Sequence, residues 1–472
     1  MTAVTPAPIE AADESGSRSQ RNWALFLLFL TITINYADRG VLNILVEPIK
    51  QELKLTDLQI GALGGLSFAI LHMSMAIPVA WAAERYNRVS IISAAMILWS
   101  GLTALCGAAQ SFLHLVLLRV GIGMGEAGAS PPGHSLLSDF FPANRRSIAL
   151  SIMNLGVPLG TMLGTLIGGA VAHFYGWRAA FLVLGLPGVF LALLLWFGLA
   201  EPSRGALDHK AAVQAKPVGL LKACGDIFRI RTFVLFAVAS SLANLANQGI
   251  IQFNAAFYVR KFGLDLIQVG AILGTTSAVA AALGMLLGGF LGDGMSRRDV
   301  RWYAWLPALG LLIAGPFTAL AFAQANWQGV LAFQVITGVC SMIYIGPVLG
   351  TNQNLAPIRM RATSVAMFNL INVGIGYGVG PMTVGYFGDH AAKRAFVSSG
   401  LGEFTSTCPG GVAPEGALEV IRHACTAASA AGLQEALAAT AVVYVIGALL
   451  FLLGGMTIRA DLARARAEHS AG

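Results

Sequence analysis

Runs of about twenty apolar residues recur along almost the whole chain and constrain its fold more than any other feature. A helix of about twenty apolar residues is long enough to cross the hydrocarbon core of a bilayer. We therefore predict an all-α membrane protein with twelve transmembrane helices. The predicted spans lie at about 23–48, 57–81, 89–110, 112–137, 147–172, 178–199, 232–256, 266–292, 303–324, 327–350, 362–387 and 433–454.

The charge balance favours the same class of protein. Charged residues make up 11% of the 472 residues, whereas soluble proteins average about 25%. Twenty of the 30 lysines and arginines fall in the tails and in the loops on one side of the predicted membrane, and eight fall in the loops on the other side. Positive residues concentrate on the cytosolic side, so we predict a multi-pass protein of an inner or plasma membrane with both termini in the cytosol. The net charge of +7 is explained by these loops and predicts no nucleic-acid partner.

The spans divide into two groups of six. Residues between them carry six basic side chains and two prolines, which is typical of a polar connection rather than a span. The expected segments are a disordered cytosolic tail at 1–22, a six-helix bundle at 23–200, a cytosolic linker at 201–231, a second six-helix bundle at 232–456 with a long outer loop at 388–432, and a cytosolic tail at 457–472.

The two halves repeat each other in their loops. PANRRSIALSIMNL, from Pro142, aligns with PIRMRATSVAMFNL, from Pro357, at a constant offset. AWAAERYNR, from Ala80, aligns in the same way with GFLGDGMSRR, from Gly289. Internal repeats of this kind are typical of transporters built from two related bundles.

Charged residues inside the predicted spans are the candidate functional groups. Arg119 and Glu126 lie seven residues apart in RVGIGMGEAGASPPG, so they share one helix face about 10 Å apart. Asp38, in the first span, is expected at a depth between them. Charges within a membrane are costly and mark functional sites by default. The alternative is an ion-pair site that only fixes helix packing.

The duplicated loops resemble the signature of the major facilitator superfamily, in which a glycine is followed by an acid and then by basic residues. Both copies are partial, because Ala80 replaces the glycine in one and Gly294 replaces a basic residue in the other. NYADRGVLNILVEPIKQELKLTDLQIGAL and RVGIGMGEAGASPPGHSLLSDFFPANRRSIAL resemble the first and fourth spans of spinster-like transporters. The resemblance implies the major facilitator fold, with twelve helices in two pseudo-symmetric bundles.

The resemblance also implies a function. Spinster-like members export lysophospholipids or sphingosine phosphate, so we expect a proton-coupled transporter of an amphiphilic anion that works by alternating access. Asp38, Arg119 and Glu126 match the residues tied to proton coupling and gating. Arg39 is expected to bind the substrate anion or to pair with Glu47 or Glu126. The alternative is a symporter of a small hydrophilic organic anion, such as a sugar acid or carboxylate.

The second half is expected to supply the wall of the substrate site. Its spans carry amides in place of ionisable groups, and amides bind polar substrates or one another. Tyrosines among apolar neighbours would make this wall partly polar and partly apolar. The candidate substrate-binding residues are Arg39, Arg119, Asn244, Gln248, Asn369, Asn372, Tyr344 and Tyr377.

The duplicated loops themselves are the candidate latch of the inner gate. Glu84, Arg88 and Asp139 are expected to meet at the cytosolic ends of the second and fourth spans. Asp293 and Arg297 form the second, weaker copy.

Cysteine spacing predicts one disulfide and no metal site. Cys408 and Cys425 share the long outer loop, which faces an oxidising compartment where disulfides persist. The residues around Cys425 are expected to form a short outer helix. We expect no metal, no cofactor and no enzymatic activity, and a monomer whose partners are the membrane bilayer, protons and a small-molecule or lipid substrate.

Overall fold

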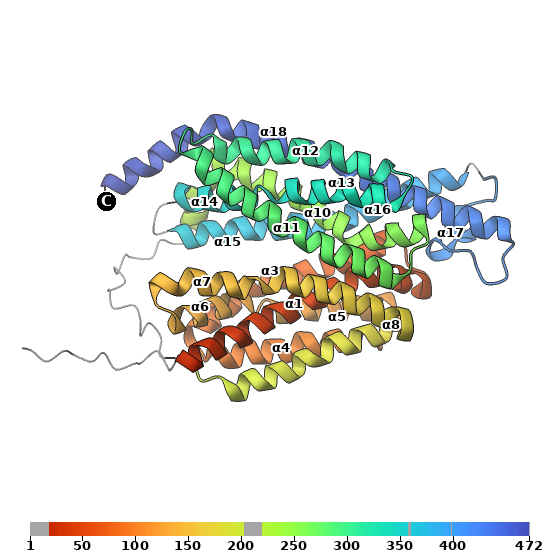
Figure 1. The fold of residues 1–472 in the computed structure, drawn as a ribbon, viewed down its shortest axis with the longest axis horizontal. Helices are drawn as coiled ribbons and strands as arrows, with labels where there is room; N and C mark the ends of the chain where they lie inside the picture. Colours follow the sequence, from red (N-terminus) through yellow and green to blue (C-terminus); the bar gives the residue numbers. More distant parts are fainter. Residues whose placement is uncertain (1–17, 203–219, 357–359, 398, 472) are drawn as a thin grey trace, which may run out of the picture.

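The computed structural model describes residues 18–202, 220–356, 360–397 and 399–471. The expected tail at 1–22 and linker at 201–231 therefore lie largely outside the described residues. The described part is helical throughout, with two short helices of other types and no strand. Figure 1 shows the helices in two layers, with α1 to α8 in one half and α10 to α18 in the other.

The first half contains eight helical segments. Several spans are divided in two at a glycine or a proline-containing turn, as between α2 and α3 at Gly65 and before α6. The segments are α1 (Arg18–Leu53), α2 (Asp57–Gly64), α3 (Leu66–Arg85), α4 (Arg88–Cys106), α5 (Phe112–Glu126), α6 (Ser130–Phe140), α7 (Ala143–Asn154) and α8 (Gly156–Gly198).

The second half begins after the amphipathic helix α9 (Leu220–Phe228), which lies in the expected linker. A π-helix, η2, replaces regular helix in the middle of its fifth span. The segments are α10 (Arg231–Phe262), α11 (Leu266–Ser296), α12 (Trp302–Ala323), α13 (Trp327–Met342), α14 (Ile345–Leu355), α15 (Arg361–Asn372), η2 (Val373–Val379), α16 (Gly380–Val397), α17 (Phe404–Thr407), η3 (Pro409–Gly411) and α18 (Glu419–Ala471).

The described helices give the predicted twelve crossings. Eleven helices are long and apolar enough to span a membrane, and one of them, Ile148–Gly198, has 51 residues. At 1.5 Å per residue that helix is about 75 Å long, more than twice the thickness of a hydrocarbon core. Gly176 interrupts it with a φ of 83°, a backbone conformation that glycine adopts without strain. The helix therefore turns at Gly176, and its two parts are two membrane spans.

The boundaries differ from expectation near the C-terminus. The expected outer loop at 388–432 is shorter, because α16 continues to Val397 and α18 already begins at Glu419. The expected short outer helix around Cys425 is the first part of α18, and the same helix continues through the expected tail to Ala471. Alanine-rich sequence on both sides of the predicted span favours helix, so the helix extends beyond the apolar segment at both ends.

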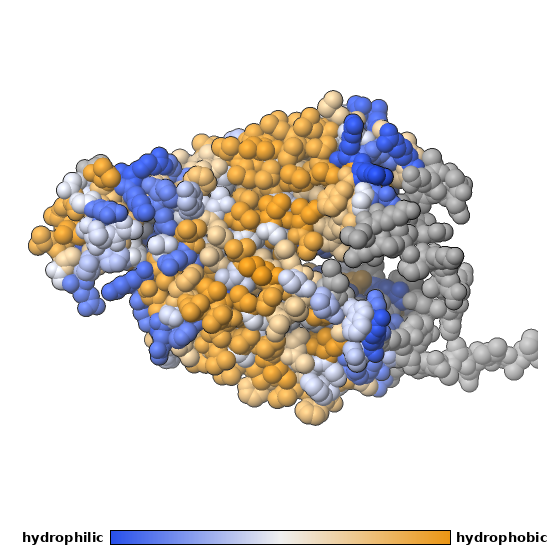
Figure 2. Space-filling model, turned by 180° about the vertical axis from the view of Figure 1, so that it is seen from behind, coloured by the Kyte–Doolittle hydropathy of each residue, from blue (hydrophilic) through white to orange (hydrophobic). Residues whose placement is uncertain are grey.

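The two ends of the molecule are distinct. The C-terminus and the first residues of α1 lie at one end, here called the terminus side, and α17 lies at the other, here called the disulfide side (Figure 1). A band of hydrophobic residues covers the surface between polar patches near the two ends (Figure 2). Large apolar side chains such as Phe197 and Phe290 are more than three-quarters exposed on the surface. Such a surface suits lipid rather than water, so the chain is a multi-pass membrane protein.

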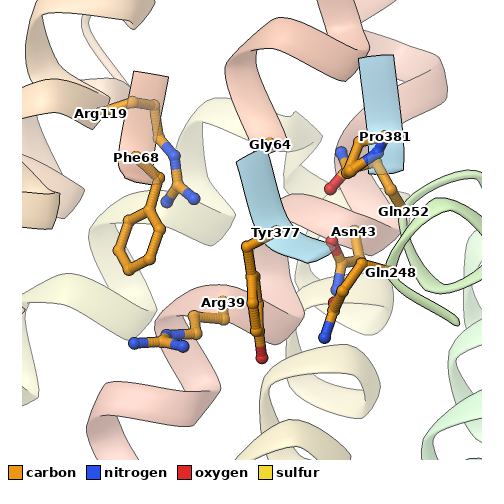
Figure 3. A pocket seen from close by; sticks show the side chains of 9 residues that line it. All are labelled: Arg39, Asn43, Gly64, Phe68, Arg119, Gln248, Gln252, Tyr377 and Pro381. Carbon is orange, nitrogen blue, oxygen red and sulfur yellow. The ribbon is translucent and has the colours of Figure 1, made fainter. Parts of the chain in front are cut away.

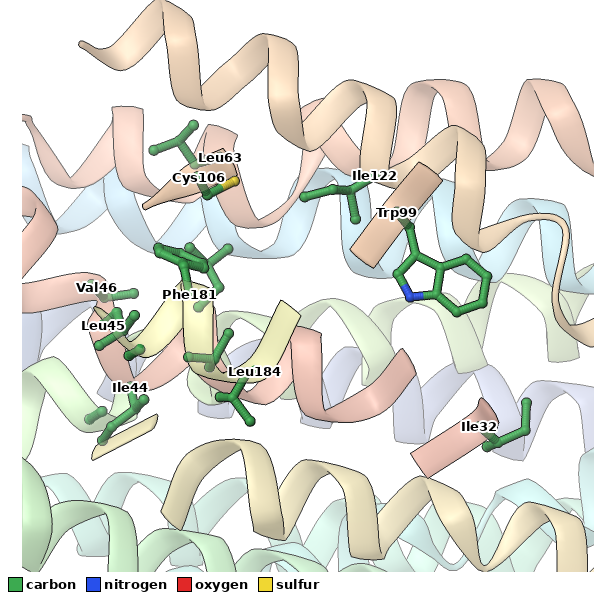
Figure 4. Close-up of a cluster of buried hydrophobic side chains, with 14 of the residues drawn as sticks. Ile32, Ile44, Leu45, Val46, Leu63, Trp99, Cys106, Ile122, Phe181 and Leu184 are labelled. Carbon is green, nitrogen blue, oxygen red and sulfur yellow. The ribbon is translucent and has the colours of Figure 1, made fainter. Parts of the chain in front are cut away.

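Glycines allow the backbones of α1 and α8 to touch. A Cβ atom at Gly160 would lie 2.1 Å from the carbonyl oxygen of Thr33, and one at Gly164 would lie 2.2 Å from that of Ala37. Small residues four apart permit this close approach in membranes. Around the contact, Ile32, Trp99 and Phe181 belong to the buried apolar core of the first half (Figure 4).

Candidate functional site

A buried network of charges joins the two halves on the disulfide side. Arg260 of α10 contacts Glu47 of α1 at 2.6 Å and Asp57 of α2 at 2.8 Å. Lys50 of α1 lies 2.7 Å from the same Asp57. All four residues are buried. The opposite charges surround one another, which is what allows charged groups to remain in a buried position.

Asp389 of α16 extends this network to the backbone. Its two carboxylate oxygens accept hydrogen bonds from the N–H groups of Asp57 and Leu58, at 3.0 and 2.9 Å. These N–H groups belong to the first turn of α2, where a helix lacks internal acceptors. A carboxylate of the second half therefore caps a helix of the first half. We call Glu47, Lys50, Asp57, Arg260 and Asp389 the disulfide-side latch.

Arg39 and Glu126 form an ion pair in the interior of the first half. The Arg39 guanidinium contacts Oε2 of Glu126 at 2.6 Å, and the glutamate side chain is fully buried. The Arg39 guanidinium also lies over the rings of Phe68 and Tyr36, at 4.7 and 4.8 Å from their centroids. Of the two acids expected as partners of Arg39, Glu126 forms the pair and Glu47 pairs with Arg260 instead, while a role of Arg39 in binding a substrate anion stays a prediction.

Arg119 forms no ion pair among the described residues with Asp38 or Glu126, the two acids near which the sequence places it. Its Nε donates to the carbonyl oxygen of Leu63 at 3.4 Å, and none of the described carboxylates forms an ion pair with it. Asp38 is fully buried and accepts a bond of 3.5 Å from the Thr103 hydroxyl, while its Oδ1 has no partner. The role of these three residues in proton coupling therefore stays a prediction.

A hollow between the halves brings several of these groups together (Figure 3). Arg39 and Arg119 of the first half reach it, and so do amides and an aromatic ring of the second half. The space that no atom occupies measures about 360 Å³, including its open part. Its lining residues are Arg39, Asn43, Gly64, Phe68, Arg119, Gln248, Gln252, Tyr377 and Pro381.

The candidate substrate residues of the second half separate into three groups. Gln248 and Tyr377 line the hollow. Asn244 and Asn372 bond to each other at 2.7 Å beside it. Tyr344 is buried in the core of the second half, and Asn369 is exposed on α15. Of the predicted amides, only Gln248 therefore lines the hollow, because Asn244 and Asn372 hydrogen-bond to each other and Asn369 points to the surface.

Gln252 and Asn43 were missed by the sequence analysis, although both line the hollow. A signal for Gln252 was present. It lies four residues after Gln248, so the two amides share one face of α10.

On the terminus side, Arg88 is the centre of a second ion cluster. It contacts Asp139 of α6 at 2.5 Å and Glu201, which follows α8, at 2.6 Å. Glu201 also accepts from the N–H groups at the start of α4. Glu84 is exposed and contacts its neighbour Arg85 at 3.9 Å instead. Of the expected trio, Arg88 and Asp139 therefore form an ion pair, and Glu201 beside Arg88 is a further member that the sequence did not predict.

The second copy of that motif forms no ion pair within the described residues. Asp293 is exposed and accepts a hydrogen bond from the Tyr303 hydroxyl at 3.2 Å, and Arg297 is exposed as well. The glycine at 294 leaves this loop without the central basic residue, so only the first copy builds a cluster.

The structure contains the predicted disulfide between Cys408 and Cys425, with Cα atoms 5.6 Å apart. The bond ties the segment after α17 to the start of α18 on the disulfide side. Among the described residues, no group of three or more His, Cys, Asp or Glu side chains could hold a metal ion.

Two helical bundles that meet around buried charges define the architecture of a membrane transporter, and comparisons with known proteins agree. The model of the Major Facilitator Superfamily matches residues 28–381. A bacterial homologue of the human lysosomal transporter Spinster, solved in an inward-facing and unoccupied conformation, superposes with a TM-score of 0.88 at 33% identity, over 94% of this chain and 99% of that one. The chain belongs to the major facilitator superfamily, as a spinster-like transporter.

Relatives differ in what they carry. An MFS-type efflux pump of Mycolicibacterium smegmatis is 34% identical, over 80% of this chain and 86% of that protein. A cis,cis-muconate transport protein of Acinetobacter baylyi is 26% identical, over 77% of this chain and 86% of that protein. A sphingosine-1-phosphate transporter of Xenopus tropicalis is 24% identical, over 79% of this chain and 74% of that protein.

Proposed function

We propose that the protein is a proton-coupled secondary transporter that moves an amphiphilic anion, such as a lysophospholipid or a sphingosine-phosphate-like lipid, by alternating access. The observation that carries the proposal is the group of buried charges around the hollow. Arg39 and Arg119 supply positive charge, and aromatic rings of Phe68 and Tyr377 lie over Arg39. An anionic head group suits the arginines, and an apolar chain suits the rings beside them.

The proposed proton sites are Asp38 and Glu126. Both carboxyl groups are buried, and each has one oxygen without a hydrogen-bond partner. A carboxylate in such a position is costly, and a bound proton removes the cost. Because Arg39 binds Glu126 and also reaches the hollow, substrate and proton act on the same arginine. Binding of the substrate then changes the affinity for the proton, and binding of the proton changes the affinity for the substrate by the same factor.

Alternating access requires that the two sides open in turn. The disulfide-side latch closes one side in this conformation. In the proposed orientation the terminus side faces the cytosol, and the protein acts as a monomer in an inner or plasma membrane. The Arg88 cluster, which joins α4, α6 and the residues after α8, is proposed to hold the first half rigid while the halves move.

The test is uptake by purified protein in liposomes across an imposed pH gradient. Lysophosphatidate and sphingosine phosphate represent the proposed class, and D-glucarate and cis,cis-muconate represent hydrophilic anions. Transport of the lipids that disappears when the gradient is collapsed would support the proposal. Transport of the hydrophilic anions alone would replace the substrate class with the alternative, a symporter of small organic anions. That alternative is favoured by the polar amides of the hollow and by the muconate-transporting relative.

A further inference from the structure

Two side chains beside the hollow carry hydrogen-bond donors that lack acceptors. The Arg119 guanidinium has five N–H donors, and the bond to the Leu63 carbonyl uses one of them. Nε2 of Gln252 is buried and has no acceptor. Both residues are at least nine-tenths buried, at 4% exposure each. A buried donor without an acceptor is rare in native proteins, so Nε2 of Gln252 requires an explanation.

The two side chains lie on either side of the same peptide. Arg119 of α5 reaches the carbonyl oxygen of Leu63. On the other side, a Cβ atom at Gly64 would lie 2.2 Å from Oε1 of Gln252 in α10. The glycine thus lets an amide of the second half come up to the junction of α2 and α3. Figure 3 shows Arg119 and Gln252 flanking Gly64 at the hollow.

The hollow has the charge expected for an anion site. Its lining contains two arginines and three amides and no carboxylate among the described residues. Of the nearby acids, Glu126 pairs with Arg39 and Asp38 accepts from Thr103, and neither forms an ion pair with Arg119 among the described residues. Arginine with further N–H donors is a recurring arrangement for binding phosphate or carboxylate.

We propose that Arg119 and Gln252 form the subsite for the single anionic group of the substrate, and that Gln252 is its specificity-determining contact from the second half. This inference rests on the proposed transport of an anion. Arg119 supplies the charge, and the Gln252 amide donates to another oxygen of the same phosphate or carboxylate. The bound anion then joins both halves next to the disulfide-side latch. Lysolipids and sugar acids share this chemistry, so the subsite serves either class.

The first experiment compares Gln252→Leu with wild-type protein in binding lysophosphatidate and, separately, D-glucarate, by isothermal titration calorimetry. Removing a donor to a charged group is expected to weaken binding of the preferred probe about tenfold or more. Gln268→Leu makes the same change at an exposed site on α11 and is expected to bind as wild type does. Equal affinity in Gln252→Leu and wild type would overturn the subsite and leave the proposed function standing.

The second experiment needs no ligand. Gln252→Glu places a carboxylate beside Arg119, so its midpoint of thermal unfolding should exceed that of Gln252→Leu, and the gain should vanish in an Arg119→Ala background. No gain would overturn the geometry whatever the transported solute. Wild-type protein that binds neither probe would overturn the proposed anionic substrate, and the unfolding comparison then decides by itself whether Gln252 lies close to Arg119.

Discussion

Asp38 and Glu126 are buried in the same half but have different surroundings. Glu126 forms a short ion pair with Arg39. Asp38 has only the Thr103 hydroxyl as a hydrogen-bond partner among the described residues. Neutralising Asp38 therefore removes a titratable group and little else. Neutralising Glu126 also leaves the largely buried Arg39 without its counter-charge, which is destabilising.

We expect both Asp38→Asn and Glu126→Gln to lower proton-driven uptake at least tenfold in liposomes. Glu126→Gln should in addition lower the midpoint of thermal unfolding more than Asp38→Asn does. Glu435→Gln is the control, because Glu435 forms an exposed ion pair with Arg394, and exposed pairs contribute about 0–1 kcal/mol. Normal gradient-driven uptake in both buried variants would contradict the proton-site assignment.

At the scale of elements, the contact of α2 with α16 closes the disulfide side. A Cβ atom at Gly61 would lie 2.4 Å from the Pro381 carbonyl oxygen, so the backbones themselves meet there. Asp389 adds the charged cap on α2, and anions at a helix N-terminus stabilise it by about 0.3–1 kcal/mol or more when buried. The contact must break whenever the disulfide side opens.

Asp389→Asn should therefore shift the population toward conformations open on the disulfide side. Spin labels on exposed Leu113 of α5 and Leu320 of α12 report the separation of the halves by pulsed electron resonance. We expect a larger fraction of long distances in Asp389→Asn than in wild type or in the Glu435→Gln control. Identical distance distributions would show that the Asp389 cap has no part in closing this side.

The close packing of α1 on α8 makes a separate prediction about stability. Gly160→Ala puts a methyl group where Thr33 has its carbonyl oxygen, and overpacking of this kind costs about 1–3 kcal/mol. The control is Gly101→Ala in α4, where a Cβ would meet nothing within 4 Å. Alanine is the better helix former, so this variant should be as stable as wild type or more so. Thermal unfolding in detergent compares them, and equal midpoints would contradict the packing argument.

At the scale of the whole molecule, the two ends should face different compartments. With the free cysteines Cys106, Cys224 and Cys340 replaced by alanine, Leu418→Cys adds a thiol on the disulfide side and Arg298→Cys adds one on the terminus side. In right-side-out vesicles, a membrane-impermeant maleimide should label the first and not the second. The reverse pattern would invert the proposed orientation.

The disulfide can be tested on the same protein. Peptide mass spectrometry without reduction should find Cys408 linked to Cys425. Closing a segment of this length adds about 3 kcal/mol of stability in the chain-entropy model, so reduction should lower the unfolding temperature. Free thiols at both positions would refute the bond.

Sequence by itself determined the features that depend on local composition. Apolar runs of membrane length give the twelve crossings, because a backbone in lipid must satisfy its hydrogen bonds within its own helix. The repeated loops predicted the two halves, and two cysteines confined to one loop predicted the disulfide. The presence of Asp38, Arg119 and Glu126 within spans marked the region of the site for the same reason, since charge in lipid is costly.

Only the tertiary structure decided which side chains meet. The pair of Arg39 with Glu126, the cap of Asp389 on α2 and the place of Glu201 beside Arg88 join residues that lie 87, 332 and 113 positions apart. Spacing along one helix fixes a face but not which neighbour that face meets. Gln252 reaches the junction of α2 and α3 because Gly64 has no side chain to exclude it. Such contacts depend on how two helices approach in space, which the order of residues within either helix does not specify.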